Sequence, residues 1–258
     1  MPTSEVYNCN CMEYMRGLPD NAFDLAVVDP PFGGGFTEGG GCKGWFSKYH
    51  QDADCSQSVN VERERERENK KQYNRFGNPG SRFERYKREP DGGNMGGEVR
   101  KKIIAWDVAP GEDYFKELFR VSRNQIIWGG NYFALPPTRC FLIWRKLTIS
   151  ENFSMAMAEY AWTSFRENAK VFECAPQGKP GDPRWHPTCK PIALYKWLLS
   201  KYAKPGDKIF DSHLGSGSSR IAAWDLGFDF VGCEIDKTYF DLAEQRFQKH
   251  TAQTRMEL

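Results

Sequence analysis

Short apolar runs alternate along most of the chain with stretches that carry apolar residues at helical spacing. Strands are expected at residues 6–8, 24–28, 125–128, 140–144, 159–164, 170–173, 208–210 and 228–234, and core-forming residues also resume at 103–106. Helices are expected at residues 12–16, 110–120, 192–202, 218–226 and 237–249. Because these strands are short, mostly apolar and separated by helices, the pattern predicts an α/β fold with a doubly wound sheet.

The apolar run at 24–28 stops at Asp29, which is followed by Pro30, Pro31 and Phe32. A proline has no backbone N–H and a fixed φ, so the chain must leave the sheet here in one stiff conformation. Taken alone, Asp-Pro-Pro is also a common way to end a strand. Open α/β sheets bind their ligands at the carboxyl ends of strands, and we therefore interpret residues 29–32 as the edge of an active site.

These four residues suit methyl transfer to an exocyclic amine. Asp29 and the carbonyl of Pro30 can each accept a hydrogen bond from an aromatic NH2 group, which aims the nitrogen lone pair at an electrophile. Phe32 offers a face on which a flipped-out base can stack, an interaction worth roughly 1–3 kcal/mol. The expected substrate is therefore a base carrying an exocyclic amine.

Residues 34–102 break the alternating pattern and predict an insertion. Glycine clusters bracket a charged centre in which Glu and Arg alternate from Glu62 to Glu68, and apolar periodicity is weak. Such a segment is typical of a loop or flap. The alternating charges can form a solvated helix, whereas the surrounding Lys and Arg residues, interleaved with Tyr and Phe, suit phosphates and unstacked bases. Since the insertion begins directly after Phe32, we expect it to contact nucleic acid.

The composition narrows the class of protein. A chain of 258 residues is long enough for one large α/β core, so a single catalytic domain is expected over residues 1–258. The net charge of +2 is small, so the overall charge does not by itself indicate a nucleic-acid-binding protein. No apolar run reaches membrane-spanning length. With no signal-peptide pattern, we expect an intracellular protein, cytoplasmic or nucleoid-associated in a prokaryote or phage and nuclear in a eukaryote. The eight cysteines show no C-x-x-C spacing, which favours reduced thiols and no metal site.

The C-terminal region predicts a nucleoside-binding unit. A strand leads into the glycine-bearing turn Asp211–Gly217, and after a helix the second strand ends at Glu234. Glycines let the backbone approach a ligand, and a carboxylate at the second strand end can bind both ribose hydroxyls. The turn lacks the G-x-G-x-x-G spacing and a phosphate-binding lysine, which favours a cofactor without pyrophosphate. The Pro-bracketed turn His186–Lys190 can bind an anion such as a carboxylate.

Near the start of the chain, Asn10 can be a ligand contact or, more commonly, a helix cap.

Several pieces occur in one consistent order: residues 29–32, 129–133, 186–191, 211–217 and 231–234, followed by Asp236 and Tyr239. Together they resemble the DNA amino-methyltransferases of the circularly permuted β class, in which the catalytic tetrad precedes the cofactor motif. The resemblance implies a mostly parallel, seven-stranded Rossmann-like methyltransferase sheet, S-adenosylmethionine as methyl donor and DNA as substrate. It also implies a restriction-modification setting and is compatible with a homodimer.

The resemblance also implies roles for individual residues. The catalytic residues would be Asp29, Pro30, Pro31 and Phe32, and the cofactor-binding residues would be Asn10, Cys11, His186, Thr188, Lys190, Asp211, His213, Gly215, Ser216, Gly217, Glu234 and Asp236. Glu234 would hold the ribose, and the turn ending at Lys190 would close over the carboxylate of the cofactor. Two positions depart from the family pattern, because Ser212-His213 replaces a Pro-Phe pair and Asn10 stands where an acid is frequent.

Three functions are compatible with these residues. The leading one is N6 methylation of an adenine flipped out of DNA, because Asp-Pro-Pro-Phe is similar to the tetrad usual in adenine N6 enzymes, whereas N4-cytosine enzymes more often begin it with serine. An N4-cytosine or RNA adenine methyltransferase would use the same site. The third is a non-catalytic, cofactor-binding subunit that recruits a partner. The presence of both an intact tetrad and an intact cofactor turn argues against this third function.

Overall fold

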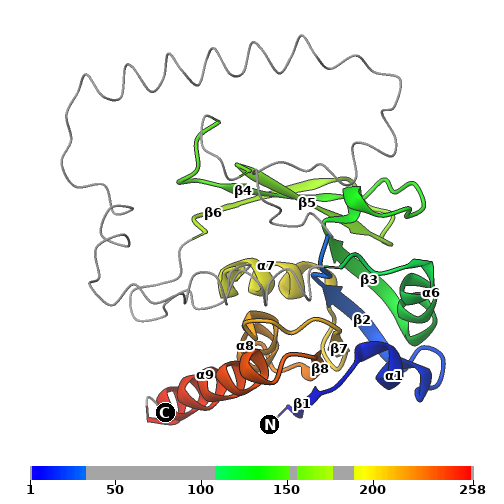
Figure 1. Ribbon diagram of the computed structural model, residues 1–258. Helices are drawn as coiled ribbons and strands as arrows, with labels where there is room; N and C mark the ends of the chain where they lie inside the picture. The colour runs from blue at the N-terminus through cyan, green and yellow to red at the C-terminus, as the bar shows by residue number, and fades with distance from the viewer. Residues whose placement is uncertain (1, 33–107, 152–155, 177–188, 257–258) are drawn as a thin grey trace, which may run out of the picture. The chain divides into compact units, whose positions relative to one another are not determined.

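The computed structural model describes residues 2–32, 108–151, 156–176 and 189–256. All of them except Val108 and Ala109 belong to one compact unit, which is shown in colour in Figure 1. The predicted insertion at 34–102 and the apolar residues 103–106 lie outside the described residues. The single-domain interpretation and the role of the insertion therefore stay predictions.

Eight strands form one sheet among the described residues, in the order β1-β8-β7-β2-β3-β5-β4-β6. They are β1 (Ser4–Asn8), β2 (Phe23–Val28), β3 (Ser122–Trp128), β4 (Leu142–Lys146), β5 (Ala158–Thr163), β6 (Lys170–Cys174), β7 (Lys208–Asp211) and β8 (Asp229–Glu234). Strand β5 is antiparallel to both of its neighbours, and the other pairs are parallel. The expectation of a mostly parallel α/β sheet is confirmed, and all eight strands expected from the sequence pattern are present. The count of seven that the resemblance implies is wrong, because β6 pairs with the outer edge of β4.

The described helices are α1 (Cys11–Arg16), α6 (Glu112–Val121), α7 (Ile192–Tyr202), α8 (Ser218–Asp225) and α9 (Lys237–Met256), with a short 3-10 helix η1 (Gly130–Tyr132) after β3. Most ends lie within two residues of those predicted, whereas α9 continues past the predicted end at residue 249. Acidic residues occupy the first turn of α6, where they oppose the positive end of the helix dipole. The sequence pattern therefore located every helix of the described residues that is longer than one turn.

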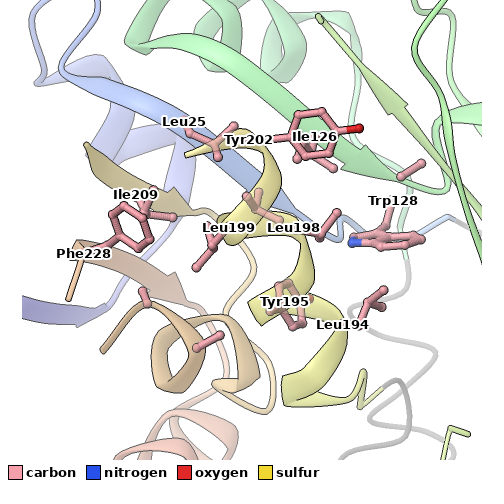
Figure 2. Packing of buried hydrophobic residues seen from close by; sticks show 14 of the residues in the cluster. Leu25, Ile126, Trp128, Leu194, Tyr195, Leu198, Leu199, Tyr202, Ile209 and Phe228 are labelled. Carbon is pink, nitrogen blue, oxygen red and sulfur yellow. The ribbon is translucent and has the colours of Figure 1, made fainter. Parts of the chain in front are cut away.

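The alternating side chains of β2 explain why both faces of the sheet are covered. Leu25 and Val27 belong to one buried cluster, to which α7 and α8 also contribute, and Figure 2 shows Leu25 together with Leu198 and other members of this cluster. Ala26 and Val28 belong to a second cluster that includes residues of α1 and α6. Burying an aliphatic side chain of this size contributes roughly 1.5–3 kcal/mol. A strand that is apolar on both faces therefore fixes helices on both sides, as Figure 1 shows.

The connections place the functional edge between β2 and β7. The chain passes from β2 towards β3 on one side, and from β7 through α8 to β8 on the other. Because β2, β7 and β8 are parallel, their carboxyl ends meet at one edge of the sheet. Asp29, Asp211 and Glu234 lie at these ends, at the point where the winding direction reverses and open α/β sheets bind ligands.

Candidate active site

Asp29 directly follows β2 and its two carboxylate oxygens have different surroundings. Oδ2 accepts a hydrogen bond from the Nζ atom of Lys190 in a buried ion pair. Oδ1 is also buried, yet it has no hydrogen-bond partner among the described residues. Burial raises the pKa of the Asp29 carboxyl above its usual value, and the ammonium of Lys190 opposes this rise. The carboxylate thus presents one oxygen that is paired and one that is available to a donor.

The ring of Phe32 lies against the turn that follows β3. Gly129 has a φ of +66°, and a Cβ atom at this position would overlap the Phe32 ring, so only glycine suits both the backbone and the contact. Phe32 stacks on Tyr132, with ring centroids 4.8 Å apart and planes inclined by 26°, and Phe133 lies 6.3 Å from it. The Gly129–Phe133 turn, one of the pieces on which the family resemblance rests, therefore supports the fourth residue of the tetrad.

Lys190 lies between two acids, with Nζ on Asp29 and 3.4 Å from Oε2 of Glu159. The expected role of its turn, closing over the carboxylate of the cofactor, stays a prediction. Lys190 is 5% exposed, and a buried ammonium is stable only beside acceptors that compensate for lost hydration. Glu159 in turn pairs with Lys146 at 2.6 Å. Sequence reasoning missed Glu159 and Lys146, since only the pairing of β4 with β5 brings them to the site.

Asp211 ends β7 as a buried carboxyl held by its own turn. Its Oδ2 atom accepts from the hydroxyl of Ser219 at 2.6 Å, and Oδ1 accepts from the backbone N–H of His213 at 3.1 Å. Burial raises the pKa of Asp211 to about 7, and the charges of Asp29 and Glu234 act in the same direction. The predicted cofactor turn therefore carries a carboxyl that titrates near neutral pH.

Glu234 ends β8 with both carboxylate oxygens fixed by backbone donors. Oε2 accepts from the N–H of Gly215 at 2.8 Å, and Oε1 accepts from the N–H of Asp236 at 3.0 Å. Gly215 and Gly217 both have positive φ, at 50° and 71°. The Ser216 hydroxyl is buried in the same turn. Asp236 caps α9, where its Oδ1 atom accepts from two backbone N–H groups. Glu234 is thus held rigidly beside the glycine turn, and each oxygen keeps a lone pair for a ligand.

The Ser212-His213 pair, which departs from the family pattern, connects the turn to α6. The Ser212 hydroxyl lies 2.6 Å from the hydroxyl of Tyr114 and 2.9 Å from Nδ1 of His213. The His213 ring meets the Tyr114 ring edge-on at 5.4 Å, and burial lowers the pKa of His213 to about 4, which keeps the imidazole neutral at physiological pH. The sequence pattern predicts Tyr114 only as a buried residue of its helix.

The remaining predicted cofactor residues divide into two groups. Asn10 caps α1, where its Oδ1 atom accepts from the N–H of Met12 at 2.9 Å, so the more common of its two predicted roles is confirmed. Cys11 begins the same helix, and burial raises the pKa of its thiol to about 11. His186 and Thr188 lie outside the described residues, so their assignment stays a prediction.

The described residues contain no group of three or more His, Cys, Asp or Glu side chains placed to hold a metal ion. Within the same residues, no helix combines the length and apolarity that a membrane crossing needs. Trp144 and Trp162 are 2% and 7% exposed and belong to the two buried clusters, so both are core residues.

Comparisons with known proteins agree with this arrangement. A model of the DNA methylase family (N6_N4_Mtase) matches residues 45–245, a range that begins after the tetrad. The type II methyltransferase M2.MboI of Moraxella bovis is 23% identical over 265 residues, which cover 95% of this chain and 88% of the relative.

Two solved structures share the fold. The cytosine-N4-specific DNA methyltransferase PvuII has 12% identity and a TM-score of 0.54, and the similarity covers 97% of this chain and 92% of that one. The structure of the putative DNA modification methylase TTHA0409 from Thermus thermophilus, complexed with S-adenosyl-L-methionine, has 14% identity and a TM-score of 0.50, with 96% and 94% covered.

Proposed function

Because the chain belongs to the N6/N4 DNA methylase family and is therefore a DNA methyltransferase, we propose that it methylates the exocyclic N6 amine of adenine. S-adenosylmethionine is the methyl donor of this family. The target base would be flipped out of the duplex, since the amine of a stacked and paired base cannot reach a buried carboxylate.

One observation carries the proposal, namely that the buried Oδ1 atom of Asp29 has no hydrogen-bond partner in the part of the chain that the structure describes. An unsatisfied buried acceptor costs roughly 1–3 kcal/mol, so it needs a donor during function. An exocyclic NH2 group is such a donor, and its second N–H can reach the carbonyl of Pro30. Since Oδ2 is committed to Lys190, the carboxylate cannot rotate freely, and Oδ1 is preorganised for the amine.

The residues at the ends of β7 and β8 fit the cofactor. Asp29, Asp211 and Glu234 place three acidic side chains near one another, and their mutual repulsion contributes to the raised pKa of Asp211. A ligand that carries a sulfonium and an ammonium would relieve this excess of negative charge. Glu234 can accept from the ribose hydroxyls, and the glycines of the adjoining turn allow close approach of the backbone. The donor set therefore suits S-adenosylmethionine.

The proposed mechanism assigns one task to each part of the tetrad. S-adenosylmethionine, when bound, supplies an electrophilic methyl group on a positively charged sulfur. Asp29 and Pro30 accept the two N–H bonds of the amine and direct its lone pair towards that methyl group. Phe32, backed by Tyr132, supplies the stacking surface for the base. The C–S bond breaks as the N–C bond forms, and the nitrogen then releases a proton that Asp29 can hold.

The choice of adenine rests on the Asp-Pro-Pro-Phe tetrad, because N4-cytosine enzymes more often begin it with serine. The likeness to PvuII shows a shared fold and leaves the base open. The test is transfer of labelled methyl groups to mixed-sequence duplex DNA, followed by digestion to nucleosides and mass analysis. We expect N6-methyl-2′-deoxyadenosine as the labelled product. N4-methylcytosine would contradict the choice of base, and label on RNA alone would contradict the DNA substrate.

We also propose that residues 34–102 recognise the DNA. The support is their sequence, in which cations and aromatic residues follow directly after Phe32. Deleting residues 40–95 should abolish DNA binding in a gel-shift assay while leaving cofactor binding intact. Retained DNA affinity in the deletion variant would defeat this assignment.

A further inference from the structure

A row of four charged side chains, two buried lysines and two partly buried acids, extends from the active site into the antiparallel part of the sheet. Asp29 contacts Lys190, Lys190 lies 3.4 Å from Glu159, and Glu159 lies 2.6 Å from Lys146. Both lysines are 5% exposed. The four charges alternate in sign along this row and add up to zero, which is the arrangement that buried charges require.

Two neighbouring strands carry Lys146 and Glu159, and two tryptophan rings lie against the lysines. Lys146 is the last residue of β4, and Glu159 lies on the neighbouring strand β5, opposite Trp144. The ammonium of Lys146 lies 5.2 Å from the centre of the Trp144 ring, and that of Lys190 lies 5.4 Å from the centre of the Trp128 ring. The two tryptophans pack edge to face at 6.5 Å. An aromatic pair therefore backs both cations and gives partial compensation for their burial.

Glu159 is shared between the two lysines. Its Oε1 atom pairs with Lys146, while its Oε2 atom faces Lys190 at the longer distance. If Lys146 were uncharged, Glu159 would keep Lys190 as its only ion-pair partner among the described residues and would compete with Asp29 for that ammonium. Asp29 would then lose the contact that holds its Oδ2 atom.

We propose that Lys146 is a positioning residue for methyl transfer: by occupying Glu159 it keeps Lys190 on Asp29, so that Oδ1 of Asp29 stays directed at the target amine. The inference rests on the proposed function, in which Asp29 holds that amine. Lys146 touches neither substrate nor cofactor in this account and acts only through Glu159 and Lys190.

The electrostatics of the four groups agree with this assignment. Burial would raise the pKa of Glu159, but Lys190 and Lys146 hold it below its usual value. Burial lowers the pKa of Lys190, yet Asp29 and Glu159 outweigh it and the pKa is raised. Besides these four groups, the described titratable side chains that interact electrostatically with Asp29 include Tyr114, Tyr195 and Asp211.

The decisive comparison uses Lys146→Met, Glu159→Gln and the double variant. In Lys146→Met we expect kcat to fall about tenfold, which corresponds to about 1.4 kcal/mol, with little change in KM for DNA or in cofactor affinity. The low-pH limb of kcat should move to higher pH, because a carboxylate that loses its ammonium is protonated more readily. In the double variant the competitor is gone, and we expect kcat to return to within about threefold of Glu159→Gln alone.

Arg145→Met is the matched control. Arg145 also lies on β4 and pairs with a glutamate, Glu173, at 2.7 Å, but this pair is exposed to solvent. We expect wild-type kcat in this variant and in Lys146→Arg, which keeps the charge. All variants are tested with labelled S-adenosylmethionine and mixed-sequence duplex DNA, and calorimetric cofactor binding verifies the fold. If Lys146→Met does not bind the cofactor, Lys146→Gln takes its place, since it keeps a donor for Glu159 without the charge.

The outcomes separate this inference from the proposed function. Wild-type kcat in the uncharged Lys146 variant, or no recovery in the double variant, would overturn the positioning role while leaving adenine methylation in place. A raised KM with unchanged kcat would overturn it as well. Failure of the wild-type protein to methylate any base would contradict the proposed function and, with it, the inference.

Discussion

The Asp211→Asn substitution should change how stability depends on pH. Unfolded, this carboxyl ionises near 3.8, whereas burial raises its pKa to about 7 in the folded protein. Folded protein then binds more protons than unfolded protein between these values, so its stability falls as pH rises through this window. At 1.36 kcal/mol for each pH unit, the full cost is about 4 kcal/mol, absent below pH 4 and complete above pH 7. Asparagine has the same shape and no charge, and should remove this cost.

Urea unfolding of the cofactor-free protein at pH 5, 6, 7 and 8 tests this reasoning. The free energy of unfolding of Asp211→Asn minus that of wild type should increase by about 2–3 kcal/mol between pH 5 and pH 8, because only the wild type loses stability over this range. Asp241→Asn, at an exposed carboxylate paired with Lys237, is the control and should follow the wild-type slope. A difference between Asp211→Asn and wild type that does not change with pH would refute the argument.

Two further substitutions test the site. Lys190→Met should lower kcat at pH 7 by about 10- to 100-fold and move its low-pH limb to higher pH, because the ammonium that opposes protonation of Asp29 is lost; an unmoved limb would contradict this. Gly129→Ala should cost about 1–3 kcal/mol of stability and abolish methyl transfer, because the new Cβ atom displaces Phe32. Gly227→Ala is the control, because Gly227 also has a positive φ, +79°, but has open space around it, so this variant should lose stability alone. Equal activity of the two variants would contradict a functional role for the contact between Gly129 and Phe32.

Local chemistry explains why so much of the fold was accessible from the sequence. In β2 the apolar positions fall on both faces, and the two prolines that follow Asp29 end the strand at one place. The glycines of the turn after β7 stand where positive φ is needed. Each of these signals is a property of adjacent residues, so it survives without knowledge of the tertiary structure.

The ion pairs of the site were not accessible in this way. Lys190 looked like an anion-binding residue because its neighbours form a stiff, Pro-bracketed turn, and nothing in that turn indicates an acid 31 positions earlier on β5. Lys146 and Glu159 meet only through the pairing of β4 with β5. The role of Tyr114 likewise depends on a hydrogen bond to Ser212, which lies 98 positions away. Long-range contacts between polar groups leave no periodicity in the sequence.

In the proposed function, Oδ1 of Asp29, which lacks a partner among the residues described, receives the amine of the target base. The most direct measurement is the single-turnover rate of methyl transfer in Asp29→Asn, together with its affinity for S-adenosylmethionine. Asparagine keeps the shape of aspartate, but one of its two terminal side-chain atoms is an NH2 donor, which would repel an N–H group of the amine. We expect a rate at least about 100-fold lower than that of the wild type, with cofactor affinity within about twofold of wild type. A rate equal to that of the wild type would contradict it.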